Sequence, residues 1–164
     1  YSKGDFSVPS NLYIIGTMNT TDRSTGSIDY AVRRRFAFIT LKTDPEVIKT
    51  CIKDDAVRAK ALALFKQING DGTDDTRSFI ATHKAGDFDL EDLKVGHSYF
   101  LVETLEALQM KMRYEVIPLL REYIKDGILQ GKEEDEEYFA AWEKGECFNP
   151  ATTEKPEASS DSEA

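Results

Sequence analysis

The chain has 164 residues, 40% of them hydrophobic, and a formal net charge of −9 at pH 7. This length can bury one core, so we expect one globular unit with appendages. The apolar runs fall well short of the roughly 20 residues of a membrane helix, no basic-then-apolar leader opens the chain, and Cys51 and Cys147 lie far apart without a neighbouring histidine. The composition thus argues against a membrane span, a disulfide scaffold and a metal site, and favours a cytoplasmic protein.

The first predicted element is a buried strand at residues 12–17. Its sequence is apolar and rich in β-forming residues, and turn formers bound it, which is typical of a strand covered on both faces of a parallel sheet. After a polar loop, Ser27 is expected to cap a short helix that runs to Arg35. Asp29 then falls in the first turn, where the helix dipole favours an anion. Residues 36–41 are predicted to form a second buried strand.

Strand, helix and strand make one crossover of an α/β sheet over residues 1–41. Two strands alone are marginal in water and leave unpaired edges. We therefore expect the other strands of the sheet to precede this segment.

A helical region is predicted over residues 42–130. Asp44 as N-cap with Pro45 at the first helical position begins one helix. A second helix restarts at Asp54, ends at Asn69 and Gly70, and carries an apolar face of Leu62, Phe65 and Ile68.

Residues 70–88 are rich in glycine and aspartate and are predicted to be a loop. A further helix is expected from Glu103, and Pro118 either kinks it or opens the next helix. The sequence at 125–127 ends that helix. The apolar stripe comprises Leu105, Leu108, Met112, Val116, Leu119, Leu120 and Tyr123.

Residues 131–164 hold eleven acidic residues and three lysines, so nearly all of the net charge belongs to this segment. Such a composition predicts an acidic, largely disordered tail. Its aromatic residues could dock a short amphipathic helix onto the body. They are Tyr138, Phe139, Trp142 and Phe148.

Candidate chemistry follows the first predicted strand, at Asn19 and Asp22. In open α/β sheets, ligands bind at the carboxyl ends of strands, where an amide can orient a water molecule or a phosphate oxygen. The alternative is that both side chains only hydrogen-bond a turn.

Arg33, Arg34 and Arg35 end the predicted short helix. Cations are favourable at a helix C-terminus, but three in succession exceed that need. Successive helical positions diverge by about 100°, so the three guanidinium groups cannot serve one ligand. One could reach across a subunit boundary and another could tie the helix to its own domain. No second basic cluster supports a nucleic-acid patch.

Residues 11–24 and 28–39 closely resemble the signature stretch of McrB-like AAA+ proteins, the motor subunits of modified-cytosine-dependent restriction systems. Residues 95–101 and 114–123 resemble the helical lid of the same family. The resemblance implies an α/β fold class: the end of an AAA+ P-loop NTPase sheet domain, with two strands and a short helix, followed by an all-α lid.

The resemblance also implies roles for particular residues. Asn19 would be the sensor that holds the attacking water near the terminal phosphate. Arg34 would be the arginine finger inserted into the neighbouring subunit's site, with Arg35 as the close alternative. Supporting residues at the interface or sensor would be Asp22, Arg23 and Asp29, and a lid sensor is conceivable at His97 and Ser98. The alternative for His97, and for His83, is a purely structural role.

The family further implies GTP or ATP with Mg²⁺, a homo-oligomeric, hexameric ring, a nuclease subunit, and DNA bound through other domains, with no membrane partner. The 164 residues contain no G-x-x-x-x-G-K-[ST] element, and Gly131-Lys132 is only a partial match. We expect that loop to precede this segment, and no nucleotide on this chain alone. A MoxR-like chaperone and a non-catalytic helical interaction module are the alternative functions.

Overall fold

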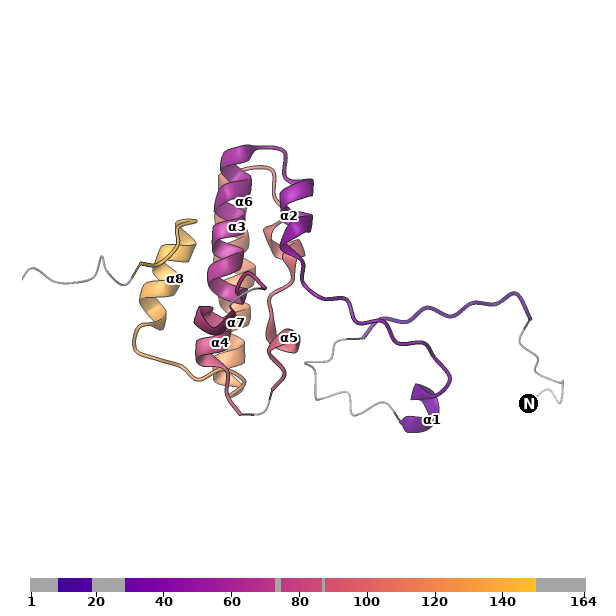
Figure 1. Cartoon of the computed structure of the whole chain (residues 1–164). Helices are drawn as coiled ribbons and strands as arrows, with labels where there is room; N and C mark the ends of the chain where they lie inside the picture. The colour runs from indigo at the N-terminus through magenta and orange to yellow at the C-terminus, as the bar shows by residue number, and fades with distance from the viewer. Residues whose placement is uncertain (1–8, 19–28, 73–74, 87, 150–164) are drawn as a thin grey trace, which may run out of the picture. The chain divides into compact units, whose positions relative to one another are not determined.

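The computed structural model describes residues 9–18, 29–72, 75–86 and 88–149 (Figure 1). The chain divides into two compact units, Tyr1–Phe38 and Ile39–Ala164. The division thus falls after Phe38, whereas the sequence suggested residue 41. Residues 150–164, which were predicted to be disordered, lie outside the described residues.

The first unit contains one short helix, α1 (Tyr30–Arg33). Asp29 is its N-cap, because the Asp29 Oδ1 atom accepts a hydrogen bond from the backbone N–H of Ala31 at 3.1 Å. The prediction, with Ser27 as the cap, had placed Asp29 two positions further into the helix. The predicted cap, Ser27, lies outside the described residues.

The two predicted strands are not strands in the structure. Residues 12–17 and 36–41 form no ladder with any other described residue, and their apolar side chains are exposed, Ile15 by 94% and Leu41 by 91%. A central strand exists only when neighbouring strands satisfy its backbone groups and cover its faces. The described residues supply no such neighbours, so the α/β part of the predicted fold class is not seen here.

The second unit is helical and begins as predicted. α2 (Pro45–Cys51) has Asp44 as its N-cap, with the Oδ1 atom accepting from Glu46 N–H at 2.8 Å. α3 (Asp55–Asn69) has Asp54 as its N-cap. Its predicted apolar face is confirmed, because Phe65 and Ile68 are buried and Leu62 packs against the same core.

Gly70 ends α3 with a φ of 90°, a backbone conformation that favours glycine. A Cβ atom at position 70 would lie 2.2 Å from the Oδ1 atom and 2.8 Å from the Cα atom of Asp75. The Asp75 side chain cannot simply turn away, because it accepts hydrogen bonds from Gly72 N–H and the Lys94 ammonium group. The end of α3 therefore depends on glycine for two separate reasons.

We expect Gly70→Ala to lower the free energy of unfolding by more than about 2 kcal/mol, since positive φ alone costs a residue with a Cβ atom about 1 kcal/mol. Gly127→Ala is the matched control. Gly127 also has a positive φ, of 71°, but its added Cβ would meet nothing within 4 Å. Urea unfolding of both variants measures the difference, and equal losses would show that the contact with Asp75 is harmless.

Part of the predicted loop at 70–88 is helical. It contains the 3₁₀ turn η2 (Asp75–Arg77) and the helix α4 (Phe79–His83), which Ser78 caps. The loop prediction from local composition was wrong here because Phe79 and Ile80 are buried in the core. Such tertiary contacts override weak helix propensity. α5 (Leu90–Leu93) and the 3₁₀ helix η3 (His97–Phe100) follow.

The next helical run consists of α6 (Leu105–Lys111), the π-helical turn η4 (Met112–Val116) and α7 (Ile117–Lys125). Pro118 cannot donate a backbone hydrogen bond, and the π turn directly before it accommodates this loss. The N–H of Ile117 donates to the Met112 carbonyl oxygen, one residue beyond the α-helical register. The apolar stripe of this run was predicted correctly, and Leu108, Met112, Val116 and Leu120 are fully buried.

α8 (Asp135–Glu143) closes the described fold. The predicted docking of an aromatic helix is confirmed, because Phe139 and Trp142 are 2% and 0% exposed. Gln67 of α3 holds this segment: its Oε1 atom accepts from Trp142 Nε1 at 2.7 Å and from Phe148 N–H at 2.9 Å. Residues 131–149 therefore belong to the folded body, although their composition had suggested a solvated tail.

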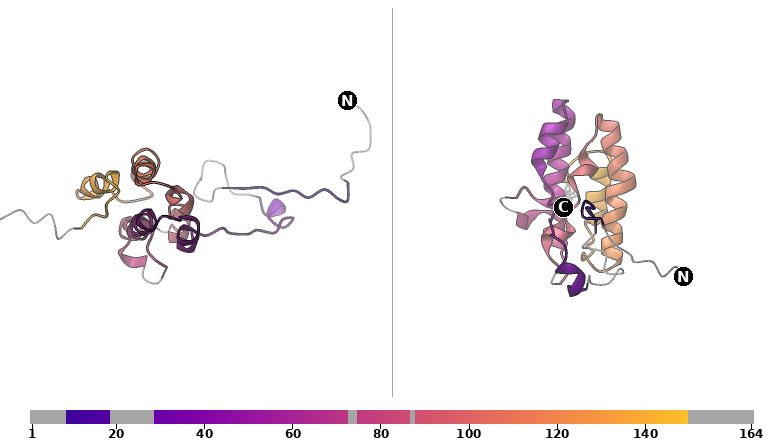
Figure 2. Two further views of the ribbon diagram at one scale, coloured as in Figure 1. Left: turned by 90° about the horizontal axis from the view of Figure 1, so that it is seen from above. Right: turned by 90° about the vertical axis from the view of Figure 1, so that its right-hand side faces the viewer.

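The helices of the second unit surround one hydrophobic core. α3 runs beside the α6–α7 helix, α2 packs at the start of α3, and α8 lies alongside (Figures 1 and 2). Among the described residues, no helix has the length and apolar character needed to cross a membrane.

Candidate functional site

The arginine triplet follows α1, and its three side chains differ in their contacts. The guanidinium of Arg33 lies over the Phe38 ring, 5.3 Å from its centroid. The Nη1 atom of Arg35 donates a hydrogen bond to the Ala31 carbonyl oxygen. Arg33 and Arg35 are thus both engaged within their own segment.

Arg34 is the C-cap of α1, and its backbone N–H donates to the Tyr30 carbonyl oxygen at 3.1 Å. Its side chain is exposed. Within the residues that the structure describes, its guanidinium forms no hydrogen bond or ion pair. A free, always-charged group with five donors remains available to an anionic ligand or to another chain.

Three predicted site residues cannot be placed. Asn19, Asp22 and Arg23 lie outside the described residues. The structure therefore does not bring them together with Arg34, and their roles remain predictions.

The lid residues Val95 to Leu101 are anchored on the end of α3. Asn69 is buried, and its side-chain amide pairs with both backbone groups of Val95, accepting from N–H at 2.8 Å and donating to the carbonyl oxygen at 2.9 Å. Phe100 packs edge-on against Phe65, with ring centroids 5.4 Å apart. The turn η3 is therefore firmly attached to the core.

His97 and Ser98 lie on this anchored turn. The Nδ1 atom of half-buried His97 accepts a hydrogen bond from the backbone N–H of Asp44 at 3.1 Å. Ser98 is exposed. His97 thus joins η3 to the start of α2, a structural contact that sequence reasoning had left open.

His83, the other histidine, has a structural position in α4. Its side chain is 1% exposed, and its Nε2 atom lies 2.8 Å from the Oδ1 atom of Asp135 in α8. Its Nδ1 atom lies 2.6 Å from the Phe79 carbonyl oxygen, and its ring stacks on the Phe79 ring with centroids 3.9 Å apart. Sequence reasoning missed this pair, because nothing local links residues so far apart.

Lys94 is a cation whose side chain is only 8% exposed, a feature that the sequence did not reveal. Burial disfavours its charged form, but the carboxylates of Asp75 and Glu91 outweigh this effect and raise the pKa of the ammonium group. The Nζ atom lies 2.7 Å from the Oδ2 atom of Asp75. The cluster joins α5 to η2 and is fully paired, so it is a structural feature.

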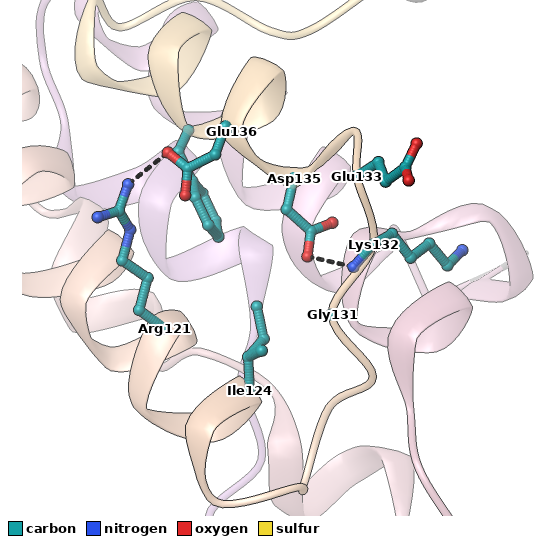
Figure 3. A pocket seen from close by; sticks show the side chains of 8 residues that line it. Arg121, Ile124, Gly131, Lys132, Glu133, Asp135 and Glu136 are labelled. Carbon is teal, nitrogen blue, oxygen red and sulfur yellow. Dashed lines mark hydrogen bonds and ion pairs between the residues drawn. The ribbon is translucent and has the colours of Figure 1, made fainter.

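The partial match Gly131-Lys132 borders a surface hollow of about 460 Å³ (Figure 3). Arg121 on its wall is paired with Glu136 at 2.7 Å and lies over the Phe139 ring. The backbone N–H of Lys132 donates to the Oδ2 atom of Asp135 at 2.9 Å. Three carboxylates, of Glu133, Asp135 and Glu136, line the hollow against two cations, which disfavours a phosphate there.

The anchored turn and the α6–α7 helix, packed with α3 around one core, form a compact helical domain. Residues 83–130 match the family described as McrB, alpha-helical lid domain. The chain is also 30% identical over 139 residues to the Type IV methyl-directed restriction enzyme EcoKMcrB subunit of Escherichia coli (strain K12). We conclude that the chain is McrB-like.

That alignment covers 77% of this chain and 29% of the relative, so the chain spans less than a third of the length of the restriction enzyme subunit. No solved structure matches the chain significantly. The family match extends from the last residue of α4 to the segment before α8, and η3 lies within it.

Proposed function

We propose that this chain is the sensor, arginine-finger and lid portion of an AAA+ nucleoside triphosphatase that drives a DNA restriction endonuclease. The main observation behind this proposal is how the three arginine side chains differ in their contacts. Arg33 is stacked on Phe38 and Arg35 is bonded to Ala31, whereas the guanidinium of Arg34 is uncommitted among the described residues. This pattern supports Arg34 as the group that acts outside its own segment.

In the proposed mechanism Arg34 enters the nucleotide site of a neighbouring subunit. There its guanidinium would neutralise charge on the transferring phosphoryl group, an effect worth about 10³ to 10⁵ in rate in other hydrolases. Asn19 would orient the attacking water from its own subunit. Asp29 supports the arrangement by capping α1, which fixes the helix whose end carries Arg34.

The enzyme that contains this chain would hydrolyse GTP or ATP with Mg²⁺, form a homo-oligomeric ring, engage a nuclease subunit and reach DNA through other domains. The McrB lid match and the similarity to the restriction enzyme subunit support this proposal. Among the described residues, no three or more of His, Cys, Asp and Glu form a cluster that could hold a metal. We therefore assign no Mg²⁺ ligand among these described residues.

Asn19→Ala in that enzyme is expected to lower kcat by about 10²-fold or more, with little change in nucleotide affinity, because a water-positioning contact matters mainly in the transition state. Steady-state hydrolysis of GTP and ATP, with equilibrium binding measured alongside, checks this. Thr20→Ala, at the adjacent position, serves as the control. An equal loss of binding and turnover would make Asn19 a structural residue, and a wild-type enzyme that hydrolyses neither nucleotide would overturn the proposed function.

A further inference from the structure

His97 forms a hydrogen bond with Asp44, the residue at which the first lid helix, α2, begins. Its Nδ1 atom accepts from the backbone N–H of Asp44, a residue 53 positions away in the sequence. Asp44 in turn caps α2 through its own side chain. One imidazole nitrogen thus fixes the residue that sets the direction of α2.

The support behind His97 is rigid. The same short segment is bonded through both backbone groups of Val95 to the buried Asn69 side chain. Phe100, at the other end of η3, is fully buried. His97 is therefore presented by a turn that is fastened on both sides, and a displacement of Asp44 would have to break its bond to His97.

The chain that His97 holds leads directly to the arginine triplet. Asp44 lies nine residues after Arg35 in the sequence, and no described helix or strand intervenes. Asp44 is thus the residue at which the segment that carries the arginine triplet joins the first lid helix.

We propose that His97 is a positioning residue, acting through the Nδ1–Asp44 hydrogen bond, that couples the lid to the arginine segment during nucleotide hydrolysis. This inference rests on the proposed function. It makes His97 neither a nucleotide ligand nor a general base. Because Nδ1 accepts from Asp44 N–H, the ring proton lies on Nε2, and within the described residues Nε2 has no hydrogen-bond partner.

Two substitutions separate the two ring nitrogens. The side-chain oxygen of His97→Asn can occupy the position of Nδ1 and still accept from Asp44 N–H. His97→Gln places its amide near the position of Nε2 and loses that bond, as does His97→Ala. Glu103→Ala is the control, because Glu103 is an exposed residue three positions after the same turn and has no proposed role in the nucleotide site.

The bond itself is tested on this chain by amide hydrogen exchange. We expect the Asp44 amide to exchange about tenfold faster in His97→Gln and His97→Ala than in the wild type, His97→Asn and Glu103→Ala proteins, as for the loss of one hydrogen bond. The same exchange rate in all five proteins would show that the hydrogen bond from Asp44 N–H to His97 does not hold Asp44, and would overturn the proposal.

The coupling is tested in the enzyme that contains the chain. We expect kcat for GTP or ATP to fall about tenfold in His97→Gln and His97→Ala, to be restored in His97→Asn, and KM to change little. Rescue by Gln instead of Asn would show that Nε2 acts on the nucleotide, and unchanged kcat in every variant would make the bond purely structural. Either result overturns the proposal.

Failure of the proposed function gives a different result. A wild-type enzyme without GTP or ATP hydrolysis would remove the kinetic role of His97 together with that function. The exchange rates would still decide whether the hydrogen bond exists.

Discussion

Arg34→Ala in the enzyme that contains this chain should reduce nucleoside triphosphate hydrolysis by about 10³-fold or more, as loss of an arginine finger does in other hydrolases. The guanidinium of Arg34 is exposed and uncommitted among the described residues, so its removal should leave the local fold intact. The mutant's own site should still bind nucleotide, because its phosphate-binding groups are unaltered. Hydrolysis rates and equilibrium binding of GTP and ATP measure the two effects.

A mixing experiment shows whether Arg34 acts between subunits. An Arg34→Ala subunit is combined with a subunit that lacks the phosphate-binding lysine but retains Arg34. Complementary interfaces then restore one complete site, so activity should exceed that of either parent. Mixed rings that remain as inactive as both parents would exclude action across the interface.

Arg33→Ala and Arg35→Ala are the matched controls for this prediction. Arg33 stacks on Phe38 and Arg35 bonds to Ala31, so these changes should lower hydrolysis much less than Arg34→Ala. A larger loss with Arg35→Ala would identify Arg35 as the finger.

Asp135→Ala should lower the free energy of unfolding of this chain by about 2 kcal/mol or more, because it leaves buried polar groups without their hydrogen-bond partner. His83 and Asp135 are 1% and 5% exposed. The change would remove the hydrogen-bond partner of the His83 Nε2 atom and also the acceptor of the Lys132 backbone N–H. α8 would then lose its polar attachment to α4 at one end.

Urea unfolding followed by the fluorescence of Trp142, the single tryptophan, measures this loss. Trp142 is a suitable probe because it is fully buried in α8. Glu136→Ala is the control, since Glu136 pairs with Arg121 at the surface, where the side chains are 73% and 52% exposed, and such pairs contribute about 0 to 1 kcal/mol. Equal small losses in both variants would mean that the buried pair does not stabilise the fold.

The sequence alone determined the helix limits of the second unit wherever the signal is local. Asp44, Asp54 and Gly70 act on backbone groups within a few residues, so their side-chain chemistry predicts where helices begin and end. The apolar stripe from Leu105 to Tyr123 was equally readable, because helical periodicity is a property of the chain itself. The resemblance to McrB-like proteins was also carried by contiguous residues, and the comparisons confirm it.

Only the tertiary structure decided how distant residues meet. His97 reaches Asp44 across 53 positions and His83 reaches Asp135 across 52, and no local pattern encodes either pairing. Packing also made helix α4 from a stretch with a loop-like composition, and drew the acidic α8 segment into the body through Phe139 and Trp142. The predicted strands also depended on tertiary partners. Residues 12–17 and 36–41 have strand-like sequences, but a strand needs neighbouring backbone to pair with, and the described residues provide none.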